Sequence, residues 1–484
     1  MLNPIVEILK FRVKTAPNSM AIMSDKGSLT YGNLVAQVRR IAVQLRTAGI
    51  VPGQVVITSF LDRQLDWLVT LALIHEACIT CSNHGYSSLD TSIGFDWEVS
   101  DRAPLGQSGV PHIHFDLSCL SQEQKVQADF LPLDYASKND IIRLVLTSGT
   151  GGIRKAVGLN FPMIEQRFRQ RQLTFGRFGQ EYTFLPICTI SGMNSAFHAL
   201  FTGAPFLSLS GYGYVIQAIN LGYVSFVSAT PFQLSRFLRF ISDQKIVLNK
   251  LKAVASGGGK TSPLLLQNIY THLSDKFLNY YGSTEAGGVC LLEMNRQVVE
   301  AMPLGFSIPG CEVEVVDEMG SELPRGEVGL LRIKTPYMAH EYFKNALASE
   351  KYFREGWFYP GDSGKILNGG LVVLSGRSGE MINRGGVKID PSVIDQFLVD
   401  YPGVIDGATC GVSNSKQLLD IELAVALVVD EGFNMGELKR KLLHAFDSSR
   451  CPTLFFQVKK IPRNAMGKVM RIQLANALEE AVKR

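Results

Sequence analysis

The stretch LVLTSGTGGIRK at 144–155 begins as an apolar strand, 144–146, and continues into a loop rich in glycine and hydroxyl residues. Three glycines and three hydroxyl side chains fall within 147–152, and Lys155 closes the segment. Such a loop exposes backbone amides and O–H donors, and a lysine offsets negative charge, so it can wrap a polyphosphate. An ordinary surface turn is the alternative that the spacing alone leaves open.

Strands and helices alternate on both sides of this loop. The run Leu34, Val38, Ile41, Ala42, Leu45 has the 3.6-residue period of an amphipathic helix. A buried strand at 55–58 and a helix at 67–74 follow it. The pattern returns as a strand at 225–227, a helix at 230–240 and a strand at 251–256. This order predicts an α/β fold with a largely parallel sheet.

The segment 311–334 has a different pattern. Its apolar residues alternate with period two, and glycine and proline turns join the strands, which predicts a small antiparallel, β-barrel-like subdomain. After Arg377 the βα alternation returns and ends in a helix from Met470. We therefore predict a large N-terminal domain, 1–377, of parallel-type sheets with helices plus the barrel-like subdomain, and a small α+β C-terminal domain, 378–484.

Composition excludes several classes of protein. The net charge is +4 and the 48 basic residues are interspersed with 44 acidic ones, whereas a nucleic-acid binder concentrates basic residues in a patch. The most apolar stretch, 67–74, is far shorter than the ~20 residues of a membrane span. Cys78 and Cys81 form a lone C-x-x-C without a second ligand pair, which predicts reduced cysteines in an apolar strand and not a zinc site. We expect a cytoplasmic protein that binds neither nucleic acid nor membrane.

A second glycine-rich segment, Gly257–Thr261, ends in G-K-T. A Walker A loop needs a glycine five residues before the G-K pair, and Val254 occupies that place. The sequence therefore disfavours a P-loop NTPase.

Six segments occur in an order typical of one superfamily. They are the loop 147–155, YGSTE at 281–285, GWFYPGD at 356–362, GR at 376–377 with INRGG at 382–386, PRNAMGKVMR at 462–471, and LTY at 29–31. Together they resemble the adenylate-forming superfamily, which includes acyl-CoA synthetases, adenylation domains of peptide synthetases and firefly luciferase. The INRGG motif most resembles the corresponding motif of stand-alone ligases of the acyl- or aryl-CoA synthetase type.

The resemblance implies that ATP and a carboxylic acid form an acyl-adenylate with release of pyrophosphate. It assigns Lys468, Thr284 and Glu285 as catalytic, with Lys468 bridging the acid and the α-phosphate and Glu285 holding Mg²⁺. The residues that it implies for nucleotide binding are Thr147, Ser148, Gly149, Thr150, Lys155, Gly257, Gly258, Tyr281, Gly282, Ser283, Asp362 and Arg377. It also implies that the C-terminal domain is mobile; Gly379 stands where the hinge of the family carries Asp or Lys.

The acid pocket implied by the resemblance consists of Thr189, Ile190, Gly192, Met193 and Gly258. Ile190 occupies the position of the aspartate that pairs with the α-ammonium of an amino acid in peptide synthetases. A buried ammonium facing isoleucine would be unpaired and costly. We therefore predict an aliphatic or aryl acid without an α-amino group.

The final acceptor implied by the resemblance is a thiol, either coenzyme A or the phosphopantetheine of a separate carrier protein. Thr189 stands where coumarate-type ligases often have a histidine that assists the thiol step. Two alternatives stay open: an amino-acid adenylation enzyme that loads a carrier protein, and a non-catalytic homologue that binds a nucleotide or acyl ligand.

Overall fold

A computed structural model of the chain provides the architecture. The residues that it describes are 3–83, 93–104, 109–116, 132–147, 154–296, 303–377, 380–384, 387–413, 421–447, 450–464 and 466–483. In these ranges, no helix combines the length and the apolar character needed to cross a lipid bilayer.

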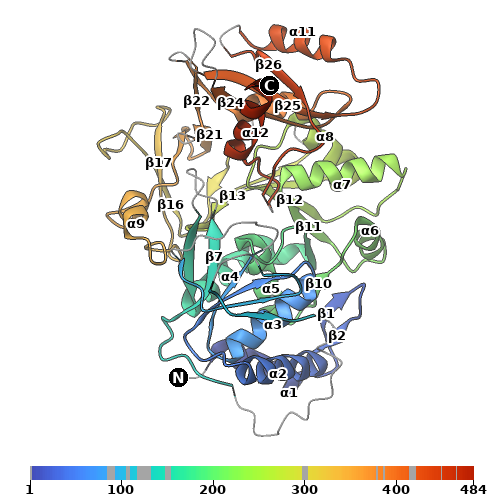
Figure 1. Ribbon diagram of the computed structural model, residues 1–484, viewed down its shortest axis with the longest axis vertical. Coiled ribbons are helices and arrows are strands. Elements are labelled where there is room, and N and C mark those ends of the chain that lie inside the picture. Colours follow the sequence, from blue (N-terminus) through green and yellow to red (C-terminus); the bar gives the residue numbers. More distant parts are fainter. Residues whose placement is uncertain are drawn as a thin grey trace.

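The first large sheet has the strand order β6-β5-β3-β4-β7-β8 and is parallel except where β8 runs antiparallel to β7. Its strands are Val55–Ser59 (β3), Ile79–Ser82 (β4), Trp97–Ser100 (β5), His112–His114 (β6), Ile141–Thr147 (β7) and Lys155–Asn160 (β8). The helices α1 (Pro4–Thr15), α2 (Tyr31–Thr47) and α3 (Arg63–His75) lie at the N-terminal end of the molecule (Figure 1). The predicted apolar stripe of α2 is buried, because its period matches the helix.

The second large sheet has the order β15-β14-β13-β12-β11-β9. Strands β9, β11, β12 and β13 are parallel, and β14 and β15 are antiparallel additions. Its strands are Glu181–Thr183 (β9), Phe226–Ala229 (β11), Ala253–Gly257 (β12), Lys276–Ser283 (β13), Gly287–Asn295 (β14) and Phe306–Ser307 (β15). The helices of this region are Phe161–Phe175 (α4), Ile190–Thr202 (α5), Tyr212–Asn220 (α6), Pro231–Asp243 (α7) and Pro263–His272 (α8).

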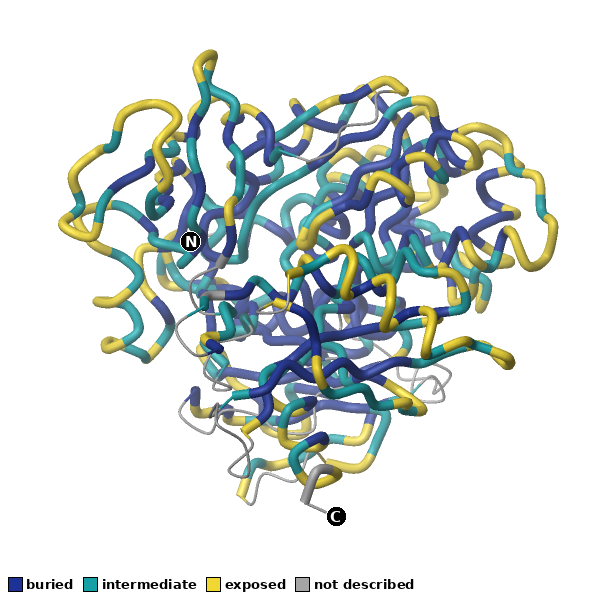
Figure 2. The backbone as a smooth tube through the Cα atoms, turned by 90° about the horizontal axis from the view of Figure 1, so that it is seen from above, coloured by how far each residue is buried: buried dark blue, intermediate teal, exposed yellow. Residues whose placement is uncertain are grey.

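A small three-stranded sheet, β10-β1-β2, lies beside these layers. Its strands are Met20–Ser24 (β1), Leu29–Thr30 (β2) and Phe206–Ser208 (β10). The main hydrophobic core joins α1, α2 and α3 to α5, and the ring of Trp67 meets the ring of Phe197 edge-on with centroids 5.2 Å apart. Figure 2 shows buried backbone through the middle of the molecule and exposed segments at its periphery.

The segment 311–334 contains antiparallel strands, as predicted. Its sheet has the order β18-β19-β17-β20-β21, with β16 paired to β17. The elements are Glu312–Val316 (β16), Gly329–Lys334 (β17), Ala346–Tyr352 (α9), Phe353–Arg354 (β18), Trp357–Phe358 (β19), Asp362–Ile366 (β20) and Val372–Arg377 (β21).

The C-terminal part is α+β, as expected, and forms one end of the molecule (Figure 1). Its elements are Ile382–Arg384 (β22), Val387–Ile389 (β23), Pro391–Val399 (α10), Val404–Ser413 (β24), Ile421–Val429 (β25), Met435–Ala445 (α11), Leu454–Gln457 (β26) and Arg471–Lys483 (α12). It meets α7 and the loop between β12 and α8 through polar contacts. These are Arg239 to Asp430 at 2.8 Å, Lys260 to Asp390 at 3.3 Å and Ser262 to Asp400 at 2.9 Å.

Candidate active site

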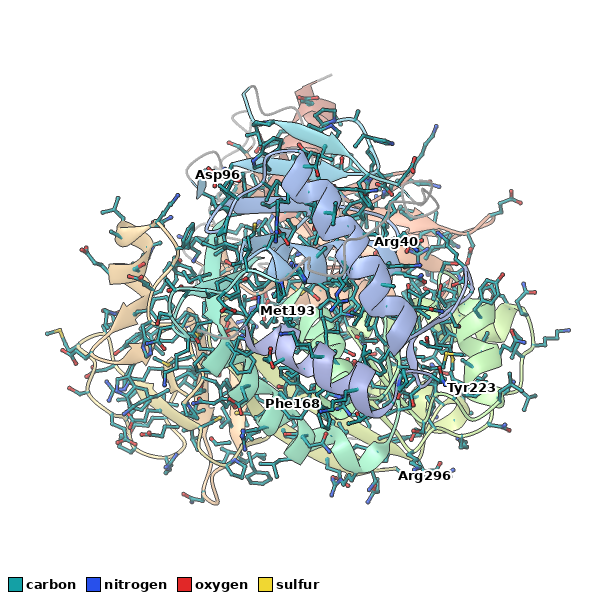
Figure 3. All side chains as sticks on the ribbon, turned by 90° about the horizontal axis from the view of Figure 1, so that it is seen from below. Arg40, Asp96, Phe168, Met193, Tyr223 and Arg296 are labelled. Atoms are coloured by element: carbon teal, nitrogen blue, oxygen red, sulfur yellow. The ribbon has the colours of Figure 1, made fainter. Side chains whose placement is uncertain are left out.

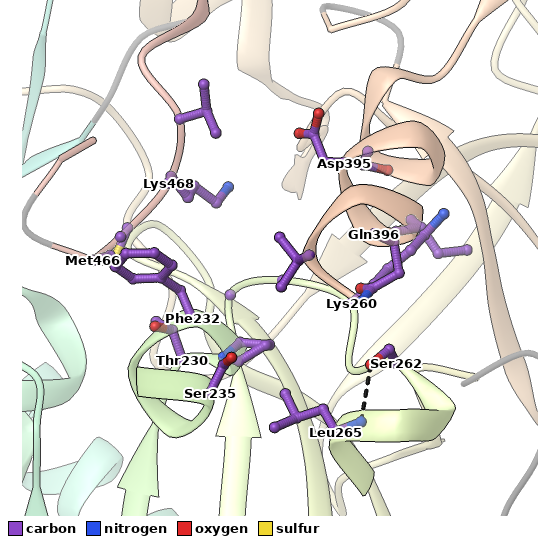
Figure 4. A pocket seen from close by; sticks show the side chains of 18 of the residues that line it. Thr230, Phe232, Ser235, Lys260, Ser262, Leu265, Asp395, Gln396, Met466 and Lys468 are labelled. Atoms are coloured by element: carbon purple, nitrogen blue, oxygen red, sulfur yellow. Dashed lines mark hydrogen bonds between the residues drawn. The ribbon is translucent and has the colours of Figure 1, made fainter. Parts of the chain in front are cut away.

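A cleft of about 320 Å³ lies between the ends of β12 and β13 and the C-terminal part. Figure 4 shows Lys468 extending from its loop into this space, opposite Asp395 and Gln396 of α10. The predicted site residues that line the cleft are Gly258, Tyr281, Gly282, Asp362 and Lys468. They come from four separate stretches of the sequence, so the fold brings distant predicted residues to one place.

Tyr281 and Asp362 form a polar pair on one wall of the cleft. The Tyr281 hydroxyl donates a hydrogen bond of 2.6 Å to Oδ2 of Asp362, which is only 3% exposed. Asp362 begins β20 and lies directly opposite Arg377 of β21 in the strand register. A buried carboxylate is suited to accept hydrogen bonds from a polyhydroxylated ligand.

Tight packing shapes the backbone beside this pair. A Cβ atom on Gly282 would lie 2.3 Å from the carbonyl oxygen of Gly287, closer than real Cβ atoms come. Only glycine permits this approach of β13 and β14. The backbone after Tyr281 is therefore held close to its neighbour strand.

The loop that carries Lys468 is held by contacts within it and with β24 and α7. Arg463 forms a forked ion pair with Asp406, with its Nε 3.0 Å from Oδ2. Oδ1 of Asn464 accepts the backbone amide of Lys468 at 3.0 Å. Gly467 adopts φ +78° against the ring of Phe232, where a side chain would clash. These contacts set the direction in which the Lys468 side chain leaves the loop.

Glu285 and Lys155 meet through a tyrosine. The Tyr342 hydroxyl donates to Oε1 of Glu285 at 2.7 Å and accepts from Nζ of Lys155 at 3.1 Å. The Lys155 ammonium lies 4.3 Å from the ring centre of Tyr342 and 3.7 Å from that of Tyr352. Burial lowers the pKa of Lys155; burial, and then the Glu285 charge, raise the pKa of Tyr342.

The chain matches the family described as AMP-binding enzyme over residues 98–343, just over half of its length. The chain belongs to this family. A relative, the putative acyl–CoA ligase YdaB of Bacillus subtilis (strain 168), is 26% identical over 72% of this chain and 70% of its own. The fatty acid–[acyl-carrier-protein] ligase ScoC of Streptomyces coeruleorubidus is 24% identical over 98% of this chain and 96% of its own.

A solved structure of the o-succinylbenzoate CoA synthetase MenE from Bacillus subtilis, in complex with the acyl-adenylate intermediate OSB-AMP, has the same fold. Its TM-score to this chain is 0.82 at 22% identity, covering 96% of this chain and 97% of that one. The predicted α/β architecture of an AMP-binding enzyme is thus confirmed.

The glycine-rich loop of this AMP-binding enzyme joins β7 to β8. Ser148, Gly149 and Thr150 lie outside the described residues. Thr147 and Lys155, at the two ends of the loop, are direct partners in the antiparallel register. The structure therefore brings the base of the predicted phosphate loop beside Tyr342.

Thr284 and Glu285 do not line the cleft of Lys468, and Ser283 separates them from Tyr281 and Gly282, which do. Ser283 caps their turn, since its hydroxyl accepts the amide of Ala286 at 3.0 Å. A buried arginine, Arg167 of α4, donates to the carbonyl oxygens of both residues at 3.1 Å. Arg167 thus holds the backbone of the predicted catalytic residues Thr284 and Glu285 in place.

Sequence reasoning missed Arg167 and Tyr342. Arg167 is only 2% exposed and lies on the buried face of α4 with Ile164 and Arg171. A signal existed, because arginines at positions i+3 and i+7 from a buried isoleucine fall on the apolar face of a helix. Tyr342 had no comparable signal, since its role depends on contacts 57 and 187 residues away in the chain.

The residues predicted to bind the acid are placed differently. Of the five, Gly258 lines the cleft. Thr189 caps α5: its hydroxyl accepts the amide of Gly192 at 3.1 Å. Ile190 is the first residue of α5, and Met193 is fully buried in the main core, near the middle of the molecule in Figure 3. A pocket-lining role for the α5 residues stays a prediction.

The site residues fit a nucleotide with a metal ion. The hydroxyls of Thr147, Ser256 and Thr261 are buried and have no hydrogen-bond partner in the described part of the chain. Ligand oxygens could satisfy such groups. Magnesium is usually held by one or two carboxylates together with phosphate oxygens and water, so the single carboxylate of Glu285 is a suitable donor.

Cys78 and Cys81 do not contribute to the site. Both thiols are buried, and burial raises the pKa of each to about 12, so they stay protonated. Cys81 lies in the apolar strand β4, as predicted, and Cys78 directly precedes that strand. Over the described ranges, no cluster of three His, Cys, Asp or Glu side chains could hold a metal ion.

Proposed function

We propose that this AMP-binding enzyme activates a carboxylic acid with ATP and passes the acyl group to a thiol. The observation that carries the proposal is the cleft, because Lys468 and the hydrogen-bonded Tyr281–Asp362 pair both line it. A cation and a polar wall in one cleft suit a reaction that joins two anions. The names of the relatives, an acyl–CoA ligase and an acyl-carrier-protein ligase, support the same chemistry.

In the first step, a carboxylate oxygen of the acid attacks the α-phosphorus of ATP. The bond from that phosphorus to the bridging oxygen breaks, and pyrophosphate leaves with the electron pair. Both reactants are anionic, so catalysis depends on cations and oriented donors. We assign Lys468 to bridge the carboxylate and the α-phosphate, and the Thr284 hydroxyl to donate to the α-phosphate.

The remaining assignments position the substrate. Asp362 accepts the ribose hydroxyls, and Tyr281 holds Asp362 while its ring packs on adenine. Lys155, at the base of the glycine-rich loop, neutralises the β- and γ-phosphates. Glu285 would hold Mg²⁺, which supplies charge neutralisation on the phosphate oxygens.

In the second step, the sulfur of the thiol attacks the acyl carbon, AMP leaves and the thiol proton passes to solvent. Both coenzyme A and a carrier-protein phosphopantetheine present this thiol. We propose an acid without an α-amino group, because the resemblance places Ile190, an apolar residue, where a partner for an ammonium would be needed. We further propose that the domain boundary lies between residues 377 and 378 and that the C-terminal domain is mobile. We also propose that the protein is cytoplasmic.

The test is ATP–pyrophosphate exchange over a panel of aliphatic, aryl and amino acids. We expect exchange with one class of acid lacking an α-amino group, and a loss of at least 100-fold in Lys468→Ala. The matched control is Lys459→Ala, because Lys459 is exposed and does not line the cleft. Exchange with α-amino acids alone would contradict the assignment of Ile190. No exchange across the panel would contradict the proposed function.

A further inference from the structure

The segment 339–343 is tied to both predicted phosphate-site regions by its backbone. The amide of Ala339 donates to the carbonyl oxygen of Glu285 at 2.8 Å, and the amide of Phe343 donates to that of Ala156 at 2.8 Å. One end of the segment is thus fixed beside Glu285 and the other beside Lys155. Tyr342 lies between these two attachments.

The side chain of Tyr342 completes the connection. Its hydroxyl donates to Glu285 and accepts from Lys155, so both functions of one phenol are used. Tyr342 is 2% exposed, and the hydroxyl of Ser349 accepts its backbone amide at 2.9 Å. Packing and hydrogen bonding therefore leave its ring little freedom.

We propose that Tyr342 is a positioning residue that couples the lysine of the phosphate loop to the acidic residue of the metal site. This inference rests on the proposed function, in which Lys155 contacts the terminal phosphates and Glu285 holds the magnesium ion. The Tyr342 phenol fixes the distance between Lys155 and Glu285, which in the proposed function bind the same MgATP.

The geometry explains why a tyrosine is needed. Tyr342 engages Oε1 of Glu285, while Oε2 accepts no hydrogen bond from the described residues and is available to a metal ion. A direct Lys155–Glu285 ion pair would instead neutralise both charges and draw the lysine away from the phosphates. The phenol separates the two charges while still orienting both.

Tyr352 provides a matched control. Its ring also contacts the Lys155 ammonium, at 3.7 Å from the ring centre, yet Tyr342 is the tyrosine that bonds to Glu285. Tyr352→Phe and Tyr342→Phe each remove one hydroxyl near Lys155. The variants differ in whether the link to Glu285 is lost.

The experiment measures MgATP binding to the full-length protein by calorimetry, with KM values from pyrophosphate exchange. We expect Tyr342→Phe to raise the MgATP dissociation constant about tenfold, which corresponds to about 1.4 kcal/mol. The Mg²⁺ concentration at half-maximal exchange should rise in parallel. The KM for the acid should stay within about twofold and the melting temperature within about 2 °C, because Phe keeps the ring.

Tyr352→Phe should change the dissociation constant less than threefold. An unchanged dissociation constant in Tyr342→Phe would overturn the inference while leaving the proposed function intact. An equal loss in both variants would also overturn it, because the effect would then belong to Lys155 alone. A wild-type protein that binds no MgATP would overturn the proposed function and the inference with it.

Discussion

Arg167→Met should disable the enzyme from a distance. The Arg167 guanidinium donates to the carbonyl oxygens of Thr284, Glu285 and Tyr337 at 3.1, 3.1 and 3.2 Å. Hydrogen bonds to a charged group each contribute about 1.5–3 kcal/mol. Two effects reduce the total. Burial of the charge is costly and lowers the pKa of Arg167 to about 10, and the Glu285 oxygen keeps the amide of Ala339.

We therefore expect the free energy of unfolding to fall by about 2–4 kcal/mol in Arg167→Met. Pyrophosphate exchange should fall about 100-fold, because Thr284 and Glu285 lose the donor that positions them. Urea unfolding measures the first quantity, and exchange at a temperature well below the melting transition measures the second. Arg167→Lys, which keeps a charge but cannot reach all three carbonyls, covers the case in which Met prevents folding.

The matched control is Arg169→Met, two residues along the same helix. Arg169 is 69% exposed and pairs with Glu165 one turn away at 2.7 Å, a surface pair of little energetic value. Stability should change by about 0.5 kcal/mol or less and exchange by less than twofold. Folded Arg167 variants with exchange within threefold of the wild type would refute the assigned role of Arg167.

Three further predictions follow from the site and the core. Tyr281→Phe should raise the KM for ATP about fivefold in exchange assays, because the 2.6 Å bond that orients Asp362 is lost; an unchanged KM would contradict this. Asp406→Asn should lower the exchange rate about tenfold with the KM for ATP within twofold, since it weakens the ion pair that holds the Lys468 loop; a normal rate would show that this ion pair is dispensable. Burial lowers the pKa of His198 from 6.5 to about 4, so the unfolded chain binds more protons between these values. The contribution of neutral His198 to the free energy of unfolding should be fully present above about pH 6.5, and the free energy of unfolding should fall by about 1–2 kcal/mol towards pH 4. Urea titrations at several pH values measure this slope, and His198→Gln should make it smaller.

Local patterns predicted the elements of the fold well. The period of α2 and the Thr230–Pro231 start of α7 are properties of neighbouring residues, and both agree with the structure. The alternation in 311–334 likewise predicted the β16–β17 pairing. In each case the residues that determine the element are close in sequence.

In the candidate site, too, residues in local sequence motifs were predicted, and residues defined by distant contacts were not. The Tyr281–Asp362 pair and Lys468 lie in recognisable segments, and the fold brings them to one cleft. The helical period could have placed Arg167 on the buried face of α4, but its bond to Thr284 spans 117 residues of the chain. The bonds of Tyr342 span 57 and 187 residues, and no local pattern indicates them. Their positions follow from how α4 and the segment 339–343 pack.

The predicted acid pocket shows that a local motif alone does not determine the role of a residue. Thr189, Gly192 and Met193 were selected by their place in a segment, but a residue at the start of a helix can also serve to cap it or to fill the core. Thr189 caps α5 and Met193 packs in the core. Periodicity of α5 would have placed Met193 inside, yet it could not show whether any side of the helix faces a pocket.

The most direct test of the central claim follows the carboxylate oxygen. An acid that supports exchange is labelled with ¹⁸O in its carboxylate, and the enzyme is allowed to complete thioester formation. If the carboxylate attacks the α-phosphorus, the released AMP must carry one ¹⁸O atom and the pyrophosphate none. Unlabelled AMP, or label in phosphate or pyrophosphate, would contradict the acyl-adenylate and the roles assigned to Lys468 and Thr284.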